Sequence, residues 1–101
     1  MTHEEANQAL LATGRFQPDF YGPSGFCPVQ AFGKLVSGEE VYFRSRGTHA
    51  SLEVRDGVRM VYFTSEVIDV WPKAGYLSGE RCVELMLAFL DRYAQEGPLP
   101  E

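Results

Sequence analysis

The feature that most constrains this chain is a run of alternating apolar and polar residues between positions 29 and 63, broken by turn-forming residues. In a strand, successive side chains point to opposite faces of the sheet. Ala50, Leu52 and Val54 therefore share one face, and the polar residues between them share the other. This pattern predicts an antiparallel sheet with one buried face and one open face.

Turn-forming residues divide this stretch into four predicted strands. Asp56-Gly57 is a strong two-residue hairpin signal, because both residue types tolerate positive φ. Gly47-Thr48 is a weaker candidate of the same length, and residues 37–39 separate the first two strands. The last predicted strand, residues 58–64, is apolar on both sides. This predicts that it is either central in the sheet or covered by a loop.

Helices are predicted at both ends of the chain. Thr2 and Glu5 have the spacing of a capping box, which predicts a helix over residues 2–13. Ser78 is a candidate N-cap for a second helix over residues 79–95, where apolar side chains recur at three- and four-residue steps. The predicted order is helix, four strands, helix. This is an α+β two-layer sandwich in which both helices pack on one face of a four-stranded antiparallel meander.

The segment between the first helix and the sheet, residues 15–28, contains three prolines and two glycines and is predicted to be an irregular loop. It also contains four aromatic residues, Phe16, Phe20, Tyr21 and Phe26. One interpretation is that these rings close one end of the core. The other is that the loop binds a partner, with Phe20 and Tyr21 as aromatic anchors.

Length and composition predict one globular domain over residues 1–101, since hydrophobic residues make up 45% of the chain. No apolar run approaches the roughly 20 residues needed to cross a bilayer, and no signal peptide pattern opens the chain. We therefore expect a cytoplasmic protein without a membrane partner. In that compartment Cys27 and Cys82 are expected to be free thiols.

The charge distribution points to the open face of the predicted sheet. Residues 29–63 carry five basic and four acidic residues, whereas the rest of the chain carries four basic and ten acidic residues. The candidate partner-binding residues on the open face are aromatic or basic: Phe32, Lys34, Tyr42, Arg44, Arg46, His49 and Arg55. Arginine and aromatic residues dominate protein-binding hot spots and also bind single-stranded nucleic acid. An ordinary solvated sheet face has the same pattern when charged residues pair across strands.

Motifs for catalysis and metal binding are weak. Cys27, Cys82, His3 and His49 do not have the short spacings of structural zinc sites, so no metal is expected. Cys27 with His49 as its base is the only candidate nucleophile pair, and no neighbouring feature predicts a lowered thiol pKa. No glycine run is followed by Lys-Ser or Lys-Thr, so no phosphate loop or cofactor is expected.

Two segments, CPVQAFGKLVSGEEVYFRSRG and WPKAGYLSGERCVELMLAFLDRY, resemble an uncharacterised group of short bacterial proteins. The group has a P-(V/L)-Q-A-x-G strand, an aromatic-F-R-x-R strand and a Trp-Pro segment before the last helix. The residues that carry the resemblance are Pro28, Gln30, Ala31, Gly33, Tyr42, Phe43, Arg44, Arg46, Trp71, Pro72, Ala74 and Gly75. The resemblance implies a sheet followed by a helix and supplies no activity.

The sequence thus predicts a small non-enzymatic protein that binds another protein through its open sheet face and aromatic loop. Inhibitors, immunity proteins and phage proteins that counter host defence are analogous. The alternatives are a single-stranded nucleic-acid-binding module, which the acidic net charge of −5 disfavours, and an enzyme that uses Cys27. An exposed edge strand or apolar patch would also permit a homodimer.

Overall fold

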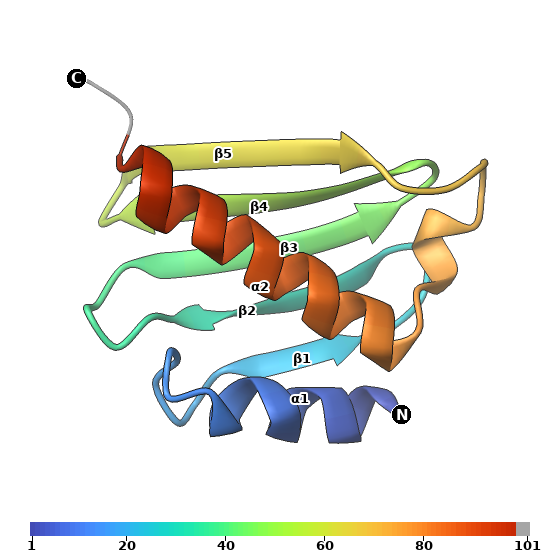
Figure 1. The fold of residues 1–101 in the computed structure, drawn as a ribbon, viewed down its shortest axis with the longest axis horizontal. Helices are drawn as coiled ribbons and strands as arrows, with labels where there is room; N and C mark the ends of the chain where they lie inside the picture. The colour runs from blue at the N-terminus through green and yellow to red at the C-terminus, as the bar shows by residue number, and fades with distance from the viewer. Residues whose placement is uncertain (99–101) are drawn as a thin grey trace.

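Five antiparallel strands lie side by side in chain order, and one helix crosses the sheet while the other runs along its first strand (Figure 1). The computed structural model describes residues 1–98. Its elements are α1 His3–Ala12, β1 Tyr21–Ser24, β2 Val29–Lys34, β3 Glu40–Arg46, β4 His49–Asp56, β5 Arg59–Val67, the short 3-10 helix η1 Ala74–Tyr76, and α2 Gly79–Glu96. The predicted α+β class with a helix at each end is confirmed.

The prediction of four strands is wrong, because β1 forms within the segment predicted to be an irregular loop. Tyr21 pairs with Phe32 and Ser24 pairs with Gln30, with an irregularity between them. The glycine and proline that indicated a loop, Gly22 and Pro23, lie inside this short edge strand, where both residue types are tolerated. Four residues are too few for their alternation to be recognised in the sequence.

The prediction for the last strand is also wrong, because β5 is an edge strand that continues to Val67. Its register explains why the sequence is apolar on both sides. Val54 pairs with Tyr62 but Arg55 pairs with Met60, so Val61 is an extra residue on β5. This bulge turns two successive side chains, Val61 and Tyr62, toward the interior, and both are buried.

The hairpin turns follow the predicted glycines, with one shift. Asp56 pairs with Arg59, so the two loop residues between β4 and β5 are Gly57 and Val58 rather than the predicted Asp56-Gly57. Arg46 pairs with His49, which confirms Gly47-Thr48 as the loop between β3 and β4. Both glycines have positive φ, 67° at Gly47 and 64° at Gly57, as such turns require.

The core lies between α2 and the inner face of the sheet. The predicted division of the meander into two faces is confirmed, since the inward residues Val29, Ala31, Val41, Phe43, Ala50, Leu52 and Val54 are all buried. From α2, Cys82, Leu85, Met86, Phe89 and Leu90 pack against them. The rings of Phe43 and Phe89 lie 6.3 Å apart between centroids.

Both helices begin at the predicted caps. Thr2 and Glu5 form a reciprocal capping box, in which each side chain accepts a hydrogen bond from the other residue's backbone N–H. The Ser78 hydroxyl accepts from the Arg81 N–H at the start of α2. α2 ends at Gly97, whose φ of 73° closes the helix.

Candidate functional site

A row of aromatic side chains crosses the open face of the sheet from one edge to the other. Tyr21 pairs with Phe32, Phe32 with Tyr42, Tyr42 with Glu53, and Glu53 with Phe63. We call Tyr21, Phe32, Tyr42 and Phe63 the aromatic row. Three of its members are about half exposed, with exposed fractions of 56% for Tyr21, 46% for Phe32 and 49% for Phe63. Cross-strand neighbours lie close together, so Tyr21, Phe32 and Tyr42 form a nearly continuous apolar surface from β1 to β3, and Glu53 on β4 separates it from Phe63.

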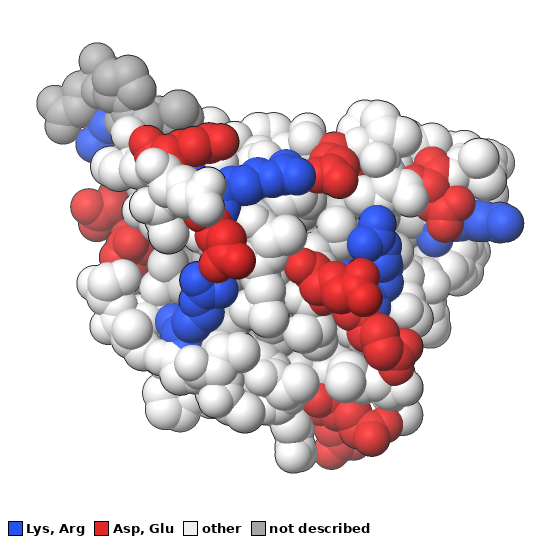
Figure 2. All heavy atoms as spheres, viewed as in Figure 1, with Lys and Arg blue, Asp and Glu red and all other residues white. Residues whose placement is uncertain are grey.

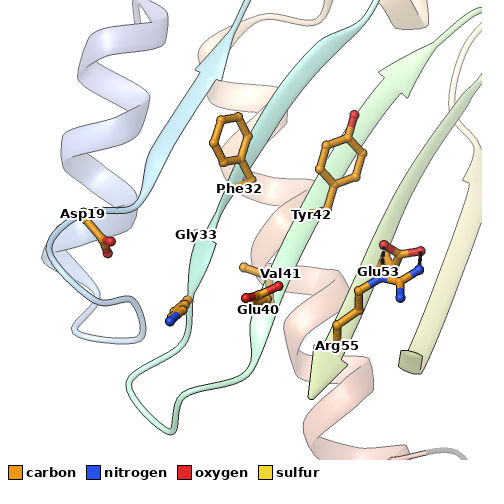
Figure 3. Close-up of a pocket in the computed structure, with 9 residues that line it drawn as sticks. Asp19, Phe32, Gly33, Glu40, Val41, Tyr42, Glu53 and Arg55 are labelled. Carbon is orange, nitrogen blue, oxygen red and sulfur yellow. Dashed lines mark hydrogen bonds and ion pairs between the residues drawn. The ribbon is translucent and has the colours of Figure 1, made fainter. Parts of the chain in front are cut away.

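On one side of the aromatic row the face is hollowed into a groove of about 570 Å³ (Figure 3). The rings of Phe32 and Tyr42 stand side by side on β2 and β3 and form one wall. The Tyr42 hydroxyl donates a 2.5 Å hydrogen bond to the Gln30 side-chain oxygen, which holds the Tyr42 ring in place. Across the groove, the Arg55 guanidinium pairs with the Glu53 carboxylate at 2.9 Å.

On the other side of the row is a second groove, of about 380 Å³, whose lining contains basic but no acidic residues. We call it the basic groove, and it is lined by Arg44, Arg46, Gly47, Thr48, His49, Ser51 and Trp71. The guanidinium groups of Arg44 and Arg46 form no ion pair or hydrogen bond within residues 1–98. Residues two apart on a strand share a face, so these two charges project together into the groove.

Arginines elsewhere in the chain differ from Arg44 and Arg46 in this respect. Arg15 pairs with Asp91 at 2.7 Å, Arg81 pairs with Glu84 at 3.2 Å, and Arg92 pairs with Glu66. Figure 2 shows this helix-covered side of the molecule, where acidic and basic side chains are interspersed. The charges of the basic groove are therefore uncompensated within residues 1–98, in a protein whose net charge is −5.

Trp71 is part of the basic groove, although in the sequence it stood out only among the residues that carry the resemblance to short bacterial proteins. Its side chain is 76% exposed. The chain brings it to the β3–β4 hairpin because Ala74 N–H donates to the Gly47 carbonyl and Lys73 forms a bridge with Gly47. The Trp71 ring passes so close to Gly47 that a Cβ at that position would lie 3.4 Å from the Trp71 Cδ1.

The predicted binding residues lie on the open face with one exception. Phe32, Lys34, Tyr42, Arg44, Arg46, His49 and Arg55 all project from β2, β3 or β4 on that side. Tyr21 joins them from β1. Phe20 does not, because it is buried and its ring packs 4.2 Å from that of Phe16 in the core. The interpretation that these rings close the core is confirmed for Phe16 and Phe20, whereas Tyr21 and Phe26 are exposed.

Phe63 is the second residue of the open face that sequence reasoning missed. It lies in the stretch that is apolar on both sides, so alternation alone did not assign it to a face. Its pairing with Glu53 places it on the open face. The sequence did carry one signal for the side on which Phe63 lies. Phe63, Ser65 and Val67 are two residues apart and share a side of the strand, and Ser65 is polar.

The cysteines do not form a catalytic pair with histidine in residues 1–98. Cys82 is buried, and burial raises the pKa of its thiol to about 12. Cys27 is exposed, and its thiol raises the pKa of Tyr76 by hydrogen bonding to the phenol. The His49 Nδ1 lies 2.7 Å from the Thr48 hydroxyl and forms no bond with Cys27. Among the described residues, no three His, Cys, Asp or Glu side chains are placed to share a metal ion.

Thiol titration should separate the two cysteines. Only the thiolate reacts quickly with disulfide reagents, and a thiol with a pKa of about 12 has almost none at pH 8. We expect one fast-reacting thiol per folded chain, and two after denaturation. In a Cys27→Ser variant the fast reaction should disappear. Two fast thiols in the folded wild-type protein would contradict the placement of Cys82 in the core.

Comparison with known proteins gives no relative. No family model matches the chain, and no curated protein and no solved structure matches it. The helices of residues 1–98 include none that is both long enough and apolar enough to cross a membrane.

Proposed function

We propose that this protein binds another protein through the open face of its sheet, without catalysing a reaction. One observation carries the proposal: half-exposed aromatic side chains cross the whole face next to two arginines that have no acidic partner in residues 1–98. Aromatic residues and arginine are the side chains enriched in the energetic centres of protein interfaces.

The energetics of the free protein favour a covered face. Half-exposed rings leave apolar surface in water, and each 100 Å² of it that a partner covers contributes roughly 2.5 kcal/mol before the costs of association. Strands β2 and β3, which carry Phe32 and Tyr42, are paired on both sides, so these two rings are held on a rigid support and little ordering entropy is lost on binding. The opposite face is already occupied by α2.

The charges define the chemistry of the partner. Arg44 and Arg46 can each donate two hydrogen bonds to a carboxylate, and the lining of the basic groove has no acidic residue that would compete for them. The partner's contact surface is therefore acidic where it meets the basic groove and apolar where it meets the aromatic row. A sheet face that combines basic charge with exposed aromatic rings suits a small cytoplasmic inhibitor or immunity protein, including a phage protein directed against host defence. We propose this class of role for the protein.

The test is affinity capture from a host lysate, with and without nuclease, by the wild-type protein and by the double variant Arg44→Glu, Arg46→Glu. A matched control is Arg81→Glu, which changes an exposed arginine on the helix side of the molecule. We expect a protein that is captured despite nuclease treatment, retained by the control and lost by the double variant. Equal capture by all three proteins would exclude the open face as the binding surface.

A second function is favoured by the basic groove itself. Trp71 lies beside Arg44 and Arg46, and an exposed indole next to unpaired guanidinium groups is suited to stacking a base and holding its phosphate. In that case the binding activity would be removed by nuclease, and affinity for single-stranded oligonucleotides would fall steeply with salt. A packed protein interface depends less on salt, so the two functions are distinguishable.

A further inference from the structure

The two edges of the sheet are protected very differently. The β1 edge is short, contains Pro23, and is flanked by α1 (Figure 1). The Asn7 side-chain amide donates hydrogen bonds to the carbonyls of Gly22 at 2.8 Å and Phe20 at 3.3 Å, which satisfies backbone groups on that side. A short strand, a proline and a covering helix are the usual means of preventing further strand pairing.

The β5 edge lacks these protections. β5 has nine residues, contains neither proline nor lysine, and pairs only with β4 in residues 1–98. Its side chains on the open face include Phe63 and Val67, with exposed fractions of 49% and 66%. Two contacts from α2 to this strand, Arg92 with Glu66 and Tyr62 with Glu96, lie on its inner face.

The register identifies which backbone groups point outward. Ile68 N–H donates to the Thr48 carbonyl at 2.8 Å, so this pair is hydrogen-bonded. In an antiparallel ladder, hydrogen-bonded pairs alternate with pairs whose N–H and C=O groups point away. Following the register from Thr48, the backbone groups of Phe63, Ser65 and Val67 therefore face outward from β5.

We propose that a second copy of this chain pairs with this edge, antiparallel, with the two-fold axis at Ser65. The bulge at Val61 ends the regular part of the strand, which leaves residues 62–68 free to pair. Pairing centred on Ser65 uses that whole segment. It places Phe63 opposite the second copy's Val67 and Ser65 opposite the second copy's Ser65.

This register is self-complementary in chemistry as well as in geometry. Apolar residues oppose apolar residues on the open face, and no like charges face each other, because Glu66 meets the second copy's Thr64. Glu66 is also paired with Arg92 of its own chain. The dimer joins two five-stranded sheets into one, and it continues the aromatic row from Phe63 onto the second copy's Val67.

Disulfide trapping tests the register directly. In a Cys27→Ser background, Ser65→Cys places two thiols across the axis, where the Cα atoms of a hydrogen-bonded pair lie about 5.5 Å apart, within the range of a disulfide. Ser51→Cys is the matched control, because Ser51 neighbours Ser65 in the same cross-strand row but lies on β4. We expect the Ser65→Cys protein to form covalent dimers at least about tenfold faster than the control, because pairing raises the effective thiol concentration. Equal rates would overturn the proposal.

Sedimentation of the unmodified protein tests the dimer without any cysteine. The mass should rise with concentration from that of one 11.3 kDa chain toward twice that value. Ser65→Pro should remain monomeric and folded, since it removes an N–H that points outward and has no backbone partner within residues 1–98. Wild-type protein that stays monomeric at all concentrations would refute the dimer. The experiment uses purified protein alone, so its failure leaves the proposed function untouched.

Discussion

Replacing Phe43 by alanine is expected to lower the free energy of unfolding by about 3–5 kcal/mol, the range for truncating a buried aromatic residue. Phe43 has no exposed surface, lies on the central strand β3, and packs against Phe89 of α2. Removing the ring leaves a cavity between sheet and helix, and β3 cannot move to close it because β2 and β4 hold it on both sides. The measurement is urea unfolding followed by circular dichroism.

The matched control for Phe43→Ala is Phe32→Ala. Phe32 is the same residue type on the neighbouring strand, but it faces the other way and is 46% exposed. Its loss is expected to cost about 1 kcal/mol, because roughly half of the ring is already in water. Similar losses for the two variants would show that the assignment of buried and open faces is wrong.

Replacing Gly22 by alanine is expected to cost about 2–4 kcal/mol, from two separate causes. Its φ is 98°, a conformation that is strained for a residue with a side chain. An added Cβ would also lie 2.6 Å from the Gln30 carbonyl oxygen and 2.8 Å from the Ala31 Cα, and these backbone atoms of β2 cannot move without breaking the sheet.

Gly38→Ala provides the control for Gly22→Ala. Gly38 has a similar φ of 103°, yet no atom lies within 4 Å of the position its Cβ would take. This variant should therefore show the backbone strain alone, about 1–2 kcal/mol. The difference between the two variants reports the close packing of β1 on β2. No difference would mean that β1 does not pair there.

The sequence predicted those parts of the fold that depend on local pattern. Alternation assigned Val54 to the core and Arg44 to the open face, and the caps at Thr2 and Ser78 located both helix starts. These signals act over a few residues, where backbone geometry determines which way a side chain points. The open face could thus be drawn with most of its residues before its structure was known.

The parts that sequence reasoning missed depend on contacts between distant segments. β1 exists because Tyr21 and Ser24 find partners on β2, which outweighs the loop propensity of Gly22 and Pro23. The bulge at Val61 changes which face each following residue of β5 occupies, and alternation cannot reveal such an inserted residue. Trp71 reaches the basic groove only through the bonds between η1 and the β3–β4 hairpin.

The measurement that tests the open face most directly is the dissociation constant of the captured protein for three purified forms of this chain. These are the wild type, the double variant Arg44→Glu, Arg46→Glu, and Arg81→Glu. Placing acidic groups against an acidic partner surface costs several kcal/mol, so the double variant should bind at least about a hundredfold more weakly. Arg81→Glu should bind like the wild type. A double variant that is folded and binds with unchanged affinity would contradict the proposal that the open face is the binding surface.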